Sequence, residues 1–369
     1  MKLLIIARPF VFHGGVERAT AGLVAALVDH GYDVHLLSPR GQAPMPGVTL
    51  HALSLPPLPP AARLLALAAC ARRRVAGSSW DVVQSHERTL CQHVYRAGEG
   101  CHRAYLASEA RPRARGLYHR IVLTLERRVF ARTPRIVAIA EAGRREIEAL
   151  YGVAASRLSV VYNGVDLERF HPRNRARERG RARSEAGIAS SAFTALFVGS
   201  GFARKGLATA IEGFAAFSDR QSRLVVLGKG DASEYRALAA RLGVAERIAW
   251  LGARDDPERW YAAADIVMLP SRYEPFGNVH LEALAAGLPV VASVRAGGAE
   301  VVADGINGAI VNPTDSRAVA AALDRFRERP VADVTAAARR SAEPYTYAAQ
   351  VEGFAQIYGG VTRARCDFP

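Results

Sequence analysis

Residues 265–293, DIVMLPSRYEPFGNVHLEALAAGLPVVAS, contain the repeating unit of the fold. A β-branched run, DIVMLP, is followed by a loop, by an alanine-rich segment, and by a second apolar run, PVVAS. Short apolar runs that alternate with helical segments indicate parallel strands joined by crossover helices. The stretch therefore predicts strand, loop, helix and strand in an open α/β sheet, whose ligands bind beyond the carboxyl ends of the strands.

The same alternation extends along the whole chain in two series. A chain of 369 residues is long for one core, so two series predict two Rossmann-like α/β domains. We expect them at 1–170 and 171–345, followed by a C-terminal helix and tail at 346–369. The expected strands include residues 2–7, 33–37, 48–53, 81–85, 135–140 and 158–162, then 193–199, 223–228, 247–252, 265–270, 289–293 and 308–311.

Composition excludes some classes of protein. The most apolar stretch, residues 55–74, is broken by prolines and by Arg63, so no membrane span is expected. The run LLIIA before Arg8 is too short for a signal peptide, which favours a cytoplasmic protein. The four cysteines, Cys70, Cys91, Cys101 and Cys366, lack zinc-type spacing, so we expect reduced thiols and no metal site.

Positive charge is concentrated in one segment. The net charge is +14. The segment from Arg103 to Arg145 contains eleven arginines and three acidic residues, an excess of 11 − 3 = +8. Such a segment attracts an anionic membrane surface or a phosphorylated substrate, and a solvated face is the plain alternative. Nucleic acid is not expected as a partner, because no recognisable binding module accompanies the charge.

Two glycine turns open the two series. Gly14 and Gly15 separate the first strand from a helix, where exposed amides favour anions. In the second series, Gly201 and Gly206 have the spacing of a phosphate loop, but leucine and alanine follow where a nucleoside triphosphatase needs lysine and serine or threonine. Arg204 and Lys205 lie in this turn, and two cations beside a helix start can hold a pyrophosphate.

Two glutamates frame the helix start in residues 265–293. Glu274 precedes the turn Phe276, Gly277 and Asn278, and Glu282 follows inside the helix. In a helix the two carboxylates lie on the order of 10 Å apart, so each could face one end of an elongated ligand. Carboxylates that accept hydrogen bonds from hydroxyls suit sugars and ribose.

These motifs resemble the signature of the retaining family 4 glycosyltransferases of GT-B fold, two Rossmann-like domains facing each other across a cleft with a C-terminal helix crossing back to the first. The resemblance covers almost the whole chain. It includes GGVERA, VYNGVDLERFHP, GSGFARKG, EPFGNVHLEALAAGLPVVAS and GGAEVVADGINGAIV. FARKG and SHERTLCQHVYRAGEGCHRAYL are most similar to the lipopolysaccharide-core glucosyltransferase I enzymes.

The resemblance implies an acceptor-binding first domain and a nucleotide-sugar-binding second domain. A nucleotide diphosphate sugar, favoured as UDP-glucose, would be the donor, and a lipopolysaccharide-core or related lipid-linked glycan the acceptor; no further cofactor is implied. Arg204 and Lys205 would bind the pyrophosphate. The sugar would lie on Glu274 and the amides of Phe276, Gly277 and Asn278. The remaining implied contacts are Glu282 with the ribose, Arg254 with the base, Gly14 and Gly15 with the phosphates, His86 with the reacting sugar, and Glu99 with the acceptor.

Retention without an evident nucleophile suggests that the diphosphate leaves first and the acceptor hydroxyl enters from the same face. Fixed cations and helix starts would then stabilise the leaving group. Three alternatives stay open. They are a family 4 mannosyl-, heptosyl- or N-acetylglucosaminyltransferase, a nucleotide-sugar epimerase of the same architecture, and a non-catalytic anion-binding protein.

Overall fold

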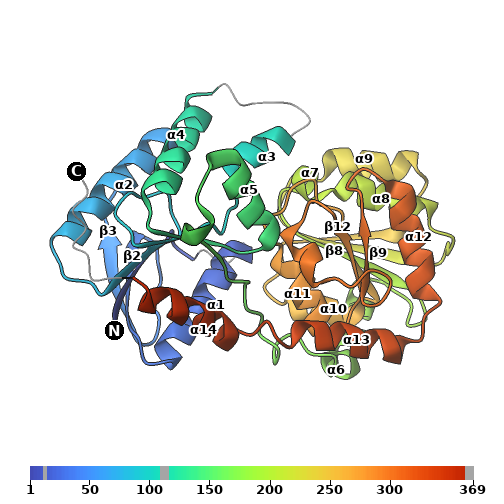
Figure 1. The fold of residues 1–369 in the computed structure, drawn as a ribbon. Coiled ribbons are helices and arrows are strands. Elements are labelled where there is room, and N and C mark those ends of the chain that lie inside the picture. Colours follow the sequence, from blue (N-terminus) through green and yellow to red (C-terminus); the bar gives the residue numbers. More distant parts are fainter. Residues whose placement is uncertain (11–14, 109–115, 362–369) are drawn as a thin grey trace. The chain divides into compact units, whose positions relative to one another are not determined.

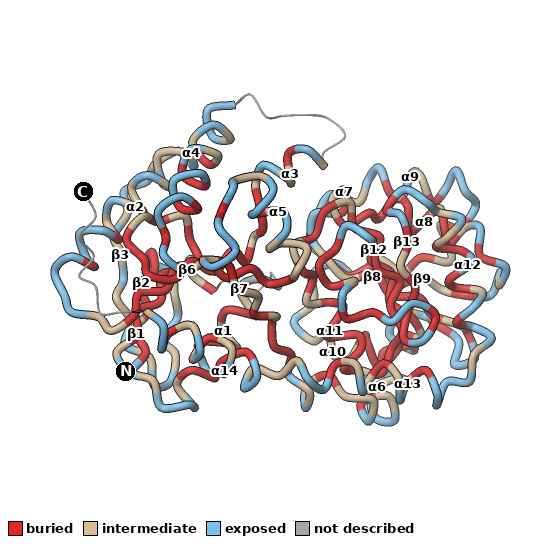
Figure 2. Tube along the Cα trace, in the orientation of Figure 1, coloured by how far each residue is buried: buried red, intermediate tan, exposed pale blue. Residues whose placement is uncertain are grey.

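The structure is a computed structural model that describes residues 1–10, 15–108 and 116–361. The chain divides into two compact units, one comprising Met1–Gly164 and Tyr347–Pro369 and the other Val165–Thr346. Each unit contains one all-parallel sheet, and in each the buried residues follow the strands (Figure 2). The two predicted Rossmann-like sheets are confirmed.

The first unit is built on seven strands in the order β3-β2-β1-β4-β5-β6-β7. Its helices are α1 to α5 and α14 (Figure 1). The strands are β1 Lys2–Ile6, β2 Asp33–Pro39, β3 Val48–Leu53, β4 Val82–Ser85, β5 Val94–Arg96, β6 Arg135–Ala138 and β7 Leu158–Val160. The helices are α1 Gly15–Asp29, α2 Pro60–Ala76, α3 His102–Ser108, α4 Leu117–Arg132, α5 Glu141–Tyr151 and α14 Tyr347–Gly359.

Strand β1 shows why the sequence LLII forms a central strand. Successive side chains of a strand point to opposite faces, so a strand covered on both sides must be apolar throughout. Leu3 and Ile5 pack in the core that includes α1, whereas Leu4 and Ile6 pack in the core that includes α2. Apolar residues on both faces thus fix β1 in the middle of the sheet.

Helix α14 returns the chain to the first unit. Its residues Val351, Phe354 and Tyr358 pack in the same core as Leu3 of β1, and the Tyr358 hydroxyl donates to Gln84 Oε1 at 2.7 Å. The C-terminal helix that the sequence predicts is therefore present, and it belongs to the first unit.

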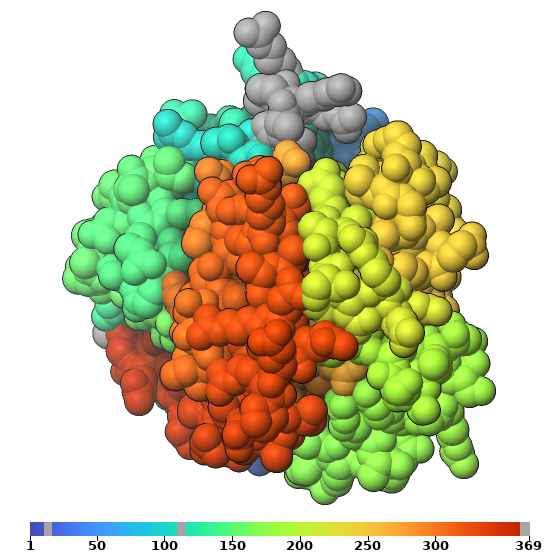
Figure 3. All heavy atoms as spheres, turned by 90° about the vertical axis from the view of Figure 1, so that its right-hand side faces the viewer, coloured from blue at the N-terminus to red at the C-terminus, as the bar shows by residue number. Residues whose placement is uncertain are grey.

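The second unit contains six strands in the order β10-β9-β8-β11-β12-β13. Helices α8 and α12 pack side by side, and a Cβ on Gly213 of α8 would lie 2.5 Å from a methyl of Val319 (Figure 3). The strands are β8 Thr194–Val198, β9 Arg223–Leu227, β10 Ile248–Gly252, β11 Ile266–Leu269, β12 Val290–Ser293 and β13 Gly308–Val311. The helices are α6 Asn174–Glu185, α7 Phe202–Lys205, α8 Leu207–Ala216, α9 Ser233–Arg241, α10 Pro257–Ala263, α11 Asn278–Ala285, α12 Ser316–Arg327 and α13 Val331–Ala342.

The first unit ends at Gly164, a few residues before the expected boundary at 170/171. The amide of Val165 donates to the carbonyl of Tyr345, and the ring of Phe170 meets Tyr261 edge-on with centroids 5.5 Å apart. These contacts attach residues 165–170 to the second unit, because their partners belong to it.

Strand order defines a switch point in each sheet. After β8 the chain proceeds outward to β9 and β10 and then returns to β11 on the other side of β8. In the first sheet β1 has β2 on one side and β4 on the other. Loops that diverge from neighbouring parallel strands leave a crevice at their carboxyl ends, which is the usual ligand position in such sheets.

Candidate functional site

In the second unit, two loops meet at the switch point between β8 and β11. The first loop follows β8 and carries α7, a single turn between Gly201 and Gly206, both in left-handed conformation. A Cβ on Gly206 would lie 2.0 Å from the carbonyl oxygen of Pro270, so only glycine allows the second loop to approach this closely. The amide of Arg272 then donates to the carbonyl of Arg204 at 2.8 Å. This contact fixes α7 against the loop that follows β11.

Arg204, Lys205 and Glu274 form one ionic cluster. Glu274 Oε2 lies 2.9 Å from Arg204 Nη1 and 2.5 Å from Lys205 Nζ. Burial alone would raise the pKa of Glu274, but the charges of Lys205 and Arg204 outweigh it and hold the pKa at about 2. The cluster therefore carries two cations and one ionised carboxylate, which gives a net positive charge at the carboxyl ends of β8 and β11.

The backbone around Glu274 is held by the loop that follows β12. The Glu274 amide donates to the carbonyl of Arg295 at 3.2 Å, and Gly297 donates to the carbonyl of Glu274 at 2.9 Å. Gly298 donates to the carbonyl of Phe276 at 2.6 Å. Gly277 has φ +86° and ends the loop that follows β11, immediately before Asn278, the first residue of α11. Three interloop hydrogen bonds thus fix the predicted segment 274–278.

His280 is a buried residue of this site that the sequence analysis missed. Its Nδ1 donates to the carbonyl of Gly277 at 2.7 Å, and a Cβ on Gly298 would lie 2.5 Å from the same nitrogen. Burial lowers the pKa of His280 to about 4, so the ring is neutral at physiological pH. The sequence offers no signal for it, because the spacing of a lone histidine in a helix does not tell whether the ring is buried. The ring is wedged between the two glycine turns that frame Glu274.

Glu282 and Arg254 lie in other surroundings. Glu282 is buried and accepts a hydrogen bond from the Tyr261 hydroxyl at 2.7 Å. Arg254 pairs with Asp256 and Glu185, each at 3.0 Å, and its guanidinium lies 5.2 Å from the centre of the Trp260 ring. Arg254 therefore belongs to a separate ionic cluster with α6 and the start of α10.

In the first unit, the predicted residues gather at the switch point between β1 and β4. Gly14 lies outside the described residues, and Gly15 is the first residue of α1. His86 follows β4 and is buried; Gln84 Nε2 lies 2.8 Å from its Nε2, and Thr20 Oγ1 lies 3.4 Å from its Nδ1. Burial, with the charges of Arg96 and Arg8, lowers the pKa of His86 well below its usual range. His86 is thus a neutral ring with both nitrogens engaged.

Glu99 is held between two arginines. Its carboxylate lies 2.6 Å from Arg8 Nη2 and 2.9 Å from Arg88 Nη1. Arg8 also pairs with Glu87 at 2.9 Å, and Arg88 with the buried Glu126 at 3.2 Å. Burial alone would raise the pKa of Glu99, but the charges of Arg8 and Arg88 outweigh it and lower the pKa. Glu99 is an ionised, immobilised acceptor of hydrogen bonds.

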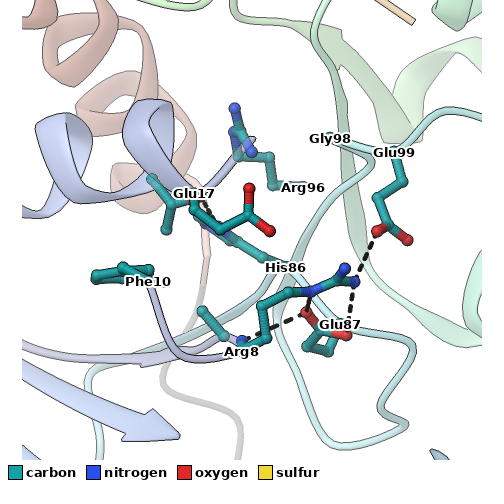
Figure 4. Close-up of a pocket in the computed structure, with 10 residues that line it drawn as sticks. Arg8, Phe10, Glu17, His86, Glu87, Arg96, Gly98 and Glu99 are labelled. Atoms are coloured by element: carbon teal, nitrogen blue, oxygen red, sulfur yellow. Dashed lines mark hydrogen bonds and ion pairs between the residues drawn. The ribbon is translucent and has the colours of Figure 1, made fainter. Parts of the chain in front are cut away.

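These groups surround a small hollow of about 10 Å³ in the first unit, about the room that one water molecule needs (Figure 4). Its lining includes Arg8, Glu17, His86, Arg96 and Glu99. The structure thus brings His86 and Glu99 to one hollow, and it brings Arg204, Lys205 and Glu274 to another site within the second unit.

Comparisons with known proteins agree with this division of the chain. The model described as Glycosyltransferase Family 4 matches residues 13–169, and the model described as Glycosyl transferases group 1 matches residues 192–328. An uncharacterized glycosyltransferase of Methanocaldococcus jannaschii, MJ1607, is 31% identical over 52% of this chain and 50% of its own length. A D-inositol 3-phosphate glycosyltransferase of Thermomonospora curvata is 32% identical over 64% of this chain and 59% of its own. The chain thus spans about half the length of these curated relatives.

Solved structures share the GT-B fold. WaaG, a glycosyltransferase involved in lipopolysaccharide biosynthesis, superimposes with a TM-score of 0.84 at 23% identity, over 97% of this chain and 100% of its own. HepE of Anabaena, in complex with UDP and glucose, gives a TM-score of 0.79 at 19% identity, over 98% and 100%. At these identities the likeness shows the fold alone.

Proposed function

We propose that this chain, which matches models of Glycosyltransferase Family 4 and of Glycosyl transferases group 1, transfers a hexose from a nucleotide diphosphate sugar to a glycan acceptor with retention of configuration. The observation that carries the proposal is the ionic cluster of Arg204, Lys205 and Glu274. Two fixed cations suit a departing diphosphate, and a carboxylate suits sugar hydroxyls. UDP-glucose is the first donor to test, because HepE holds UDP and glucose.

In the proposed reaction, the donor diphosphate competes with Glu274 for Arg204 and Lys205. The two cations stabilise the charge that develops as the glycosyl bond breaks, a role that a metal ion has in other transferases. Glu274 then orients the hexose through its hydroxyls, since its low pKa keeps it an acceptor. Glu282 would bind the ribose, and the Tyr261 hydrogen bond orients its carboxylate for that contact. The acceptor hydroxyl enters from the face that the diphosphate leaves, and its proton passes to an oxygen of the departing diphosphate.

A lipopolysaccharide-core or related lipid-linked glycan is the proposed acceptor. The support is the resemblance of FARKG and of residues 85–106 to core glucosyltransferases. Helix α4 also presents exposed Arg127, Arg128 and Arg132, and near its start Leu117 and Tyr118 are 68% and 41% exposed. Exposed arginines and exposed apolar side chains on the same helix fit the anionic cytosolic face of a membrane. Among the described residues no helix is long and apolar enough to cross a membrane.

A donor-binding experiment tests the proposal. Thermal unfolding of the whole chain is measured with UDP-, GDP- and ADP-sugars, since a ligand that binds only the folded state raises the melting temperature. We expect one nucleotide class to stabilise the wild type and to fail with Lys205→Met. The absence of stabilisation by every nucleotide sugar would refute the proposal. Conversion of the donor sugar without any acceptor would instead identify an epimerase.

The membrane contact is tested separately by vesicle sedimentation. Wild type should sediment with vesicles containing anionic phosphatidylglycerol and stay in solution with phosphatidylcholine alone. Replacing Arg127, Arg128 and Arg132 by glutamine should abolish the difference. Replacing exposed Arg173, Arg177 and Arg181 around α6 provides a matched loss of charge in the other unit. Equal sedimentation with both vesicles would remove the membrane from the proposal.

A further inference from the structure

The guanidinium of Arg96 is buried without a balancing carboxylate. Arg96 is the last residue of β5 and is 1% exposed. Its Nη2 donates to Asn163 Oδ1 at 2.6 Å, but its Nε and Nη1 have no hydrogen-bond partner among the residues that the structure describes. Burial lowers the pKa of Arg96 to about 10, with the phenols of Tyr347 and Tyr358 acting in the opposite direction. The group therefore remains a cation at neutral pH.

Arg8 and Arg88, the other two arginines of this region, are paired with carboxylates. Arg8 is paired with Glu87 and Glu99, and Arg88 with Glu99 and Glu126. A buried charge is costly unless it is paired and its hydrogen bonds are satisfied. Buried donors that lack a partner are rare in proteins, and each asks for an explanation, such as a bound water, an ion or a functional role. Of these three arginines, Arg96 alone lacks a carboxylate partner within the described part of the chain.

Arg96 lies on the lining of the hollow in the first unit, with His86, Gly98 and Glu99 (Figure 4). A Cβ on Gly98 would lie 2.4 Å from Arg96 Nη1, so a glycine at this position leaves the guanidinium its place beside the hollow. The charge of Arg96 also acts on His86, which is neutral and hydrogen-bonded. An arriving anionic group would therefore meet in Arg96 a cation that no carboxylate of the described residues pairs with.

We propose that Arg96 forms an oxyanion subsite at the hollow of the first unit, where its Nε or its Nη1 binds one carboxylate or phosphate oxygen carried by the acceptor sugar. The N–H groups of Nε and Nη1 point to different sides of the guanidinium, so a single charge-assisted hydrogen bond holds that oxygen. This inference rests on the proposed function, because it takes the hollow as the acceptor site. It specifies that the acceptor unit carries an acidic substituent, while its hydroxyls face Glu99 and Glu17.

Binding of simple sugars tests the subsite. Isothermal titration of the whole chain is carried out with glucose 6-phosphate, glucuronate and neutral glucose. We expect one or both anionic sugars to bind at least about tenfold more tightly than glucose, which is the scale of a hydrogen bond to a charged group. Tighter binding of the phosphate or of the carboxylate would identify the substituent. Equal affinity of all three sugars, or no binding, would overturn the proposal and leave a buried water as the occupant.

Variants locate the binding. Arg96→Gln should weaken binding of the anionic sugar about tenfold or more, and Arg96→Lys should weaken it less, because the charge remains although the N–H donors move. Gly98→Ala should also weaken it, since the added methyl displaces the guanidinium and leaves its charge. Arg73→Gln, which removes an exposed arginine of α2, should bind as the wild type does. Unchanged affinity in a folded Gly98→Ala and in Arg96→Lys would contradict the proposal even if Arg96→Gln failed to fold.

Donor binding separates this inference from the proposed function. UDP is titrated against the same variants, and we expect Arg96→Gln to retain UDP and Lys205→Met to lose it. Lys205→Met should keep the anionic sugar, because Lys205 belongs to the second unit. If the wild type binds the anionic sugar but not UDP, the proposed donor chemistry fails and the subsite stands. If the wild type binds UDP but binds the anionic sugars no more tightly than glucose, the subsite proposal fails and the proposed function stands.

Discussion

Two ionic clusters, one in each unit, occupy equivalent positions in two similar sheets and carry opposite excess charge. The cluster at β8 and β11 joins Arg204 and Lys205 to the single carboxylate of Glu274. The cluster at β1 and β4 joins two arginines to three carboxylates, those of Glu87, Glu99 and Glu126. The fold fixes where a ligand can bind, whereas the side chains at the switch point decide which ligand charge is favoured.

The difference predicts distinct tasks for the two clusters. An excess of cations stabilises a leaving diphosphate, and an excess of clamped carboxylates holds hydroxyls without releasing protons. Arg96 stands outside the second arrangement, which is why it needs its own partner. The following experiments alter one cluster at a time, beginning with the largest expected effect.

Lys205→Met removes one of the two cations while preserving most of the side chain's volume. If Lys205 stabilises the departing diphosphate, turnover should fall by about 10²–10³-fold, the usual loss for one preorganised electrostatic group. Steady-state transfer from the donor found in the binding screen measures this. Lys229→Met is the matched control, because Lys229 is exposed and follows β9 at the same sheet edge. Equal transfer rates in the two variants would mean that Lys205 does not stabilise the departing diphosphate.

Glu274→Gln tests the charge balance of the same cluster through pH. The folded pKa of Glu274 is about 2 against a usual 4.5, so its ionisation stabilises the fold above pH 4.5, and the contribution is lost as pH falls toward 2. The shift corresponds to about 3 kcal/mol, of which we expect about 2 because Arg204 is partly exposed. The stability difference between wild type and Glu274→Gln should be constant from pH 7 to 5 and shrink below. A difference that persists unchanged at pH 2.5 would argue against an ionic origin.

Glu99→Gln probes the clamp in the first unit. The variant leaves Arg8 and Arg88 with one fewer carboxylate, and we expect a loss of about 1–3 kcal/mol in stability, as for a buried charged hydrogen bond. Denaturant unfolding of the whole chain provides the measurement. Glu141→Gln is the control, since Glu141 forms a surface pair with Arg144 at 2.7 Å, and it should cost less than about 0.5 kcal/mol. Equal losses would mean that the clamp is no stronger than a surface ion pair.

The smallest effect is expected at His280, where asparagine and glutamine each place a side-chain amide near one of the two ring nitrogens. Asparagine at 280 places an N–H near the position of Nδ1 and can keep the hydrogen bond to Gly277, whereas glutamine places it near Nε2. We expect His280→Asn to retain more transferase activity than His280→Gln, by several-fold for a bond of about 1 kcal/mol. Melting temperatures of both variants show whether folding is equally affected. The reverse order of activities would exclude the Gly277 bond as the reason for His280.

Sequence patterns were sufficient for much of the fold. Apolar runs predicted both parallel sheets, and YTYAAQVEGFAQIYGG predicted the closing helix that packs Phe354 into the first core. The unit boundary was less accessible, because the attachment of residues 165–170 depends on contacts with Tyr345 and Tyr261, distant in sequence. Gly201 and Gly206 were identifiable from their spacing. The close approach of the Pro270 carbonyl to Gly206 was not, because it joins loops from two different strands.

The candidate sites divide in the same way. The order of residues suggested Arg204, Lys205 and Glu274 as one group, and the structure brings them within ion-pair distance. It also associates Arg254 with Glu185 and Asp256 instead of with that group. His280 and Arg96 were not singled out, because nothing in a sequence tells whether a lone histidine or arginine will be buried.

By itself, the sequence determined the alternation of strands and helices, the glycine turns and the presence of cations and carboxylates at strand ends, because these depend on local spacing. The tertiary structure decided which charges are paired and which are not. That outcome depends on strand order, which sets Glu274 against Lys205 and leaves Arg96 buried without a carboxylate. Pairing of charges is a long-range property of the fold, and in this protein it separates a cluster with excess cations in the second unit from a cluster with excess carboxylates in the first.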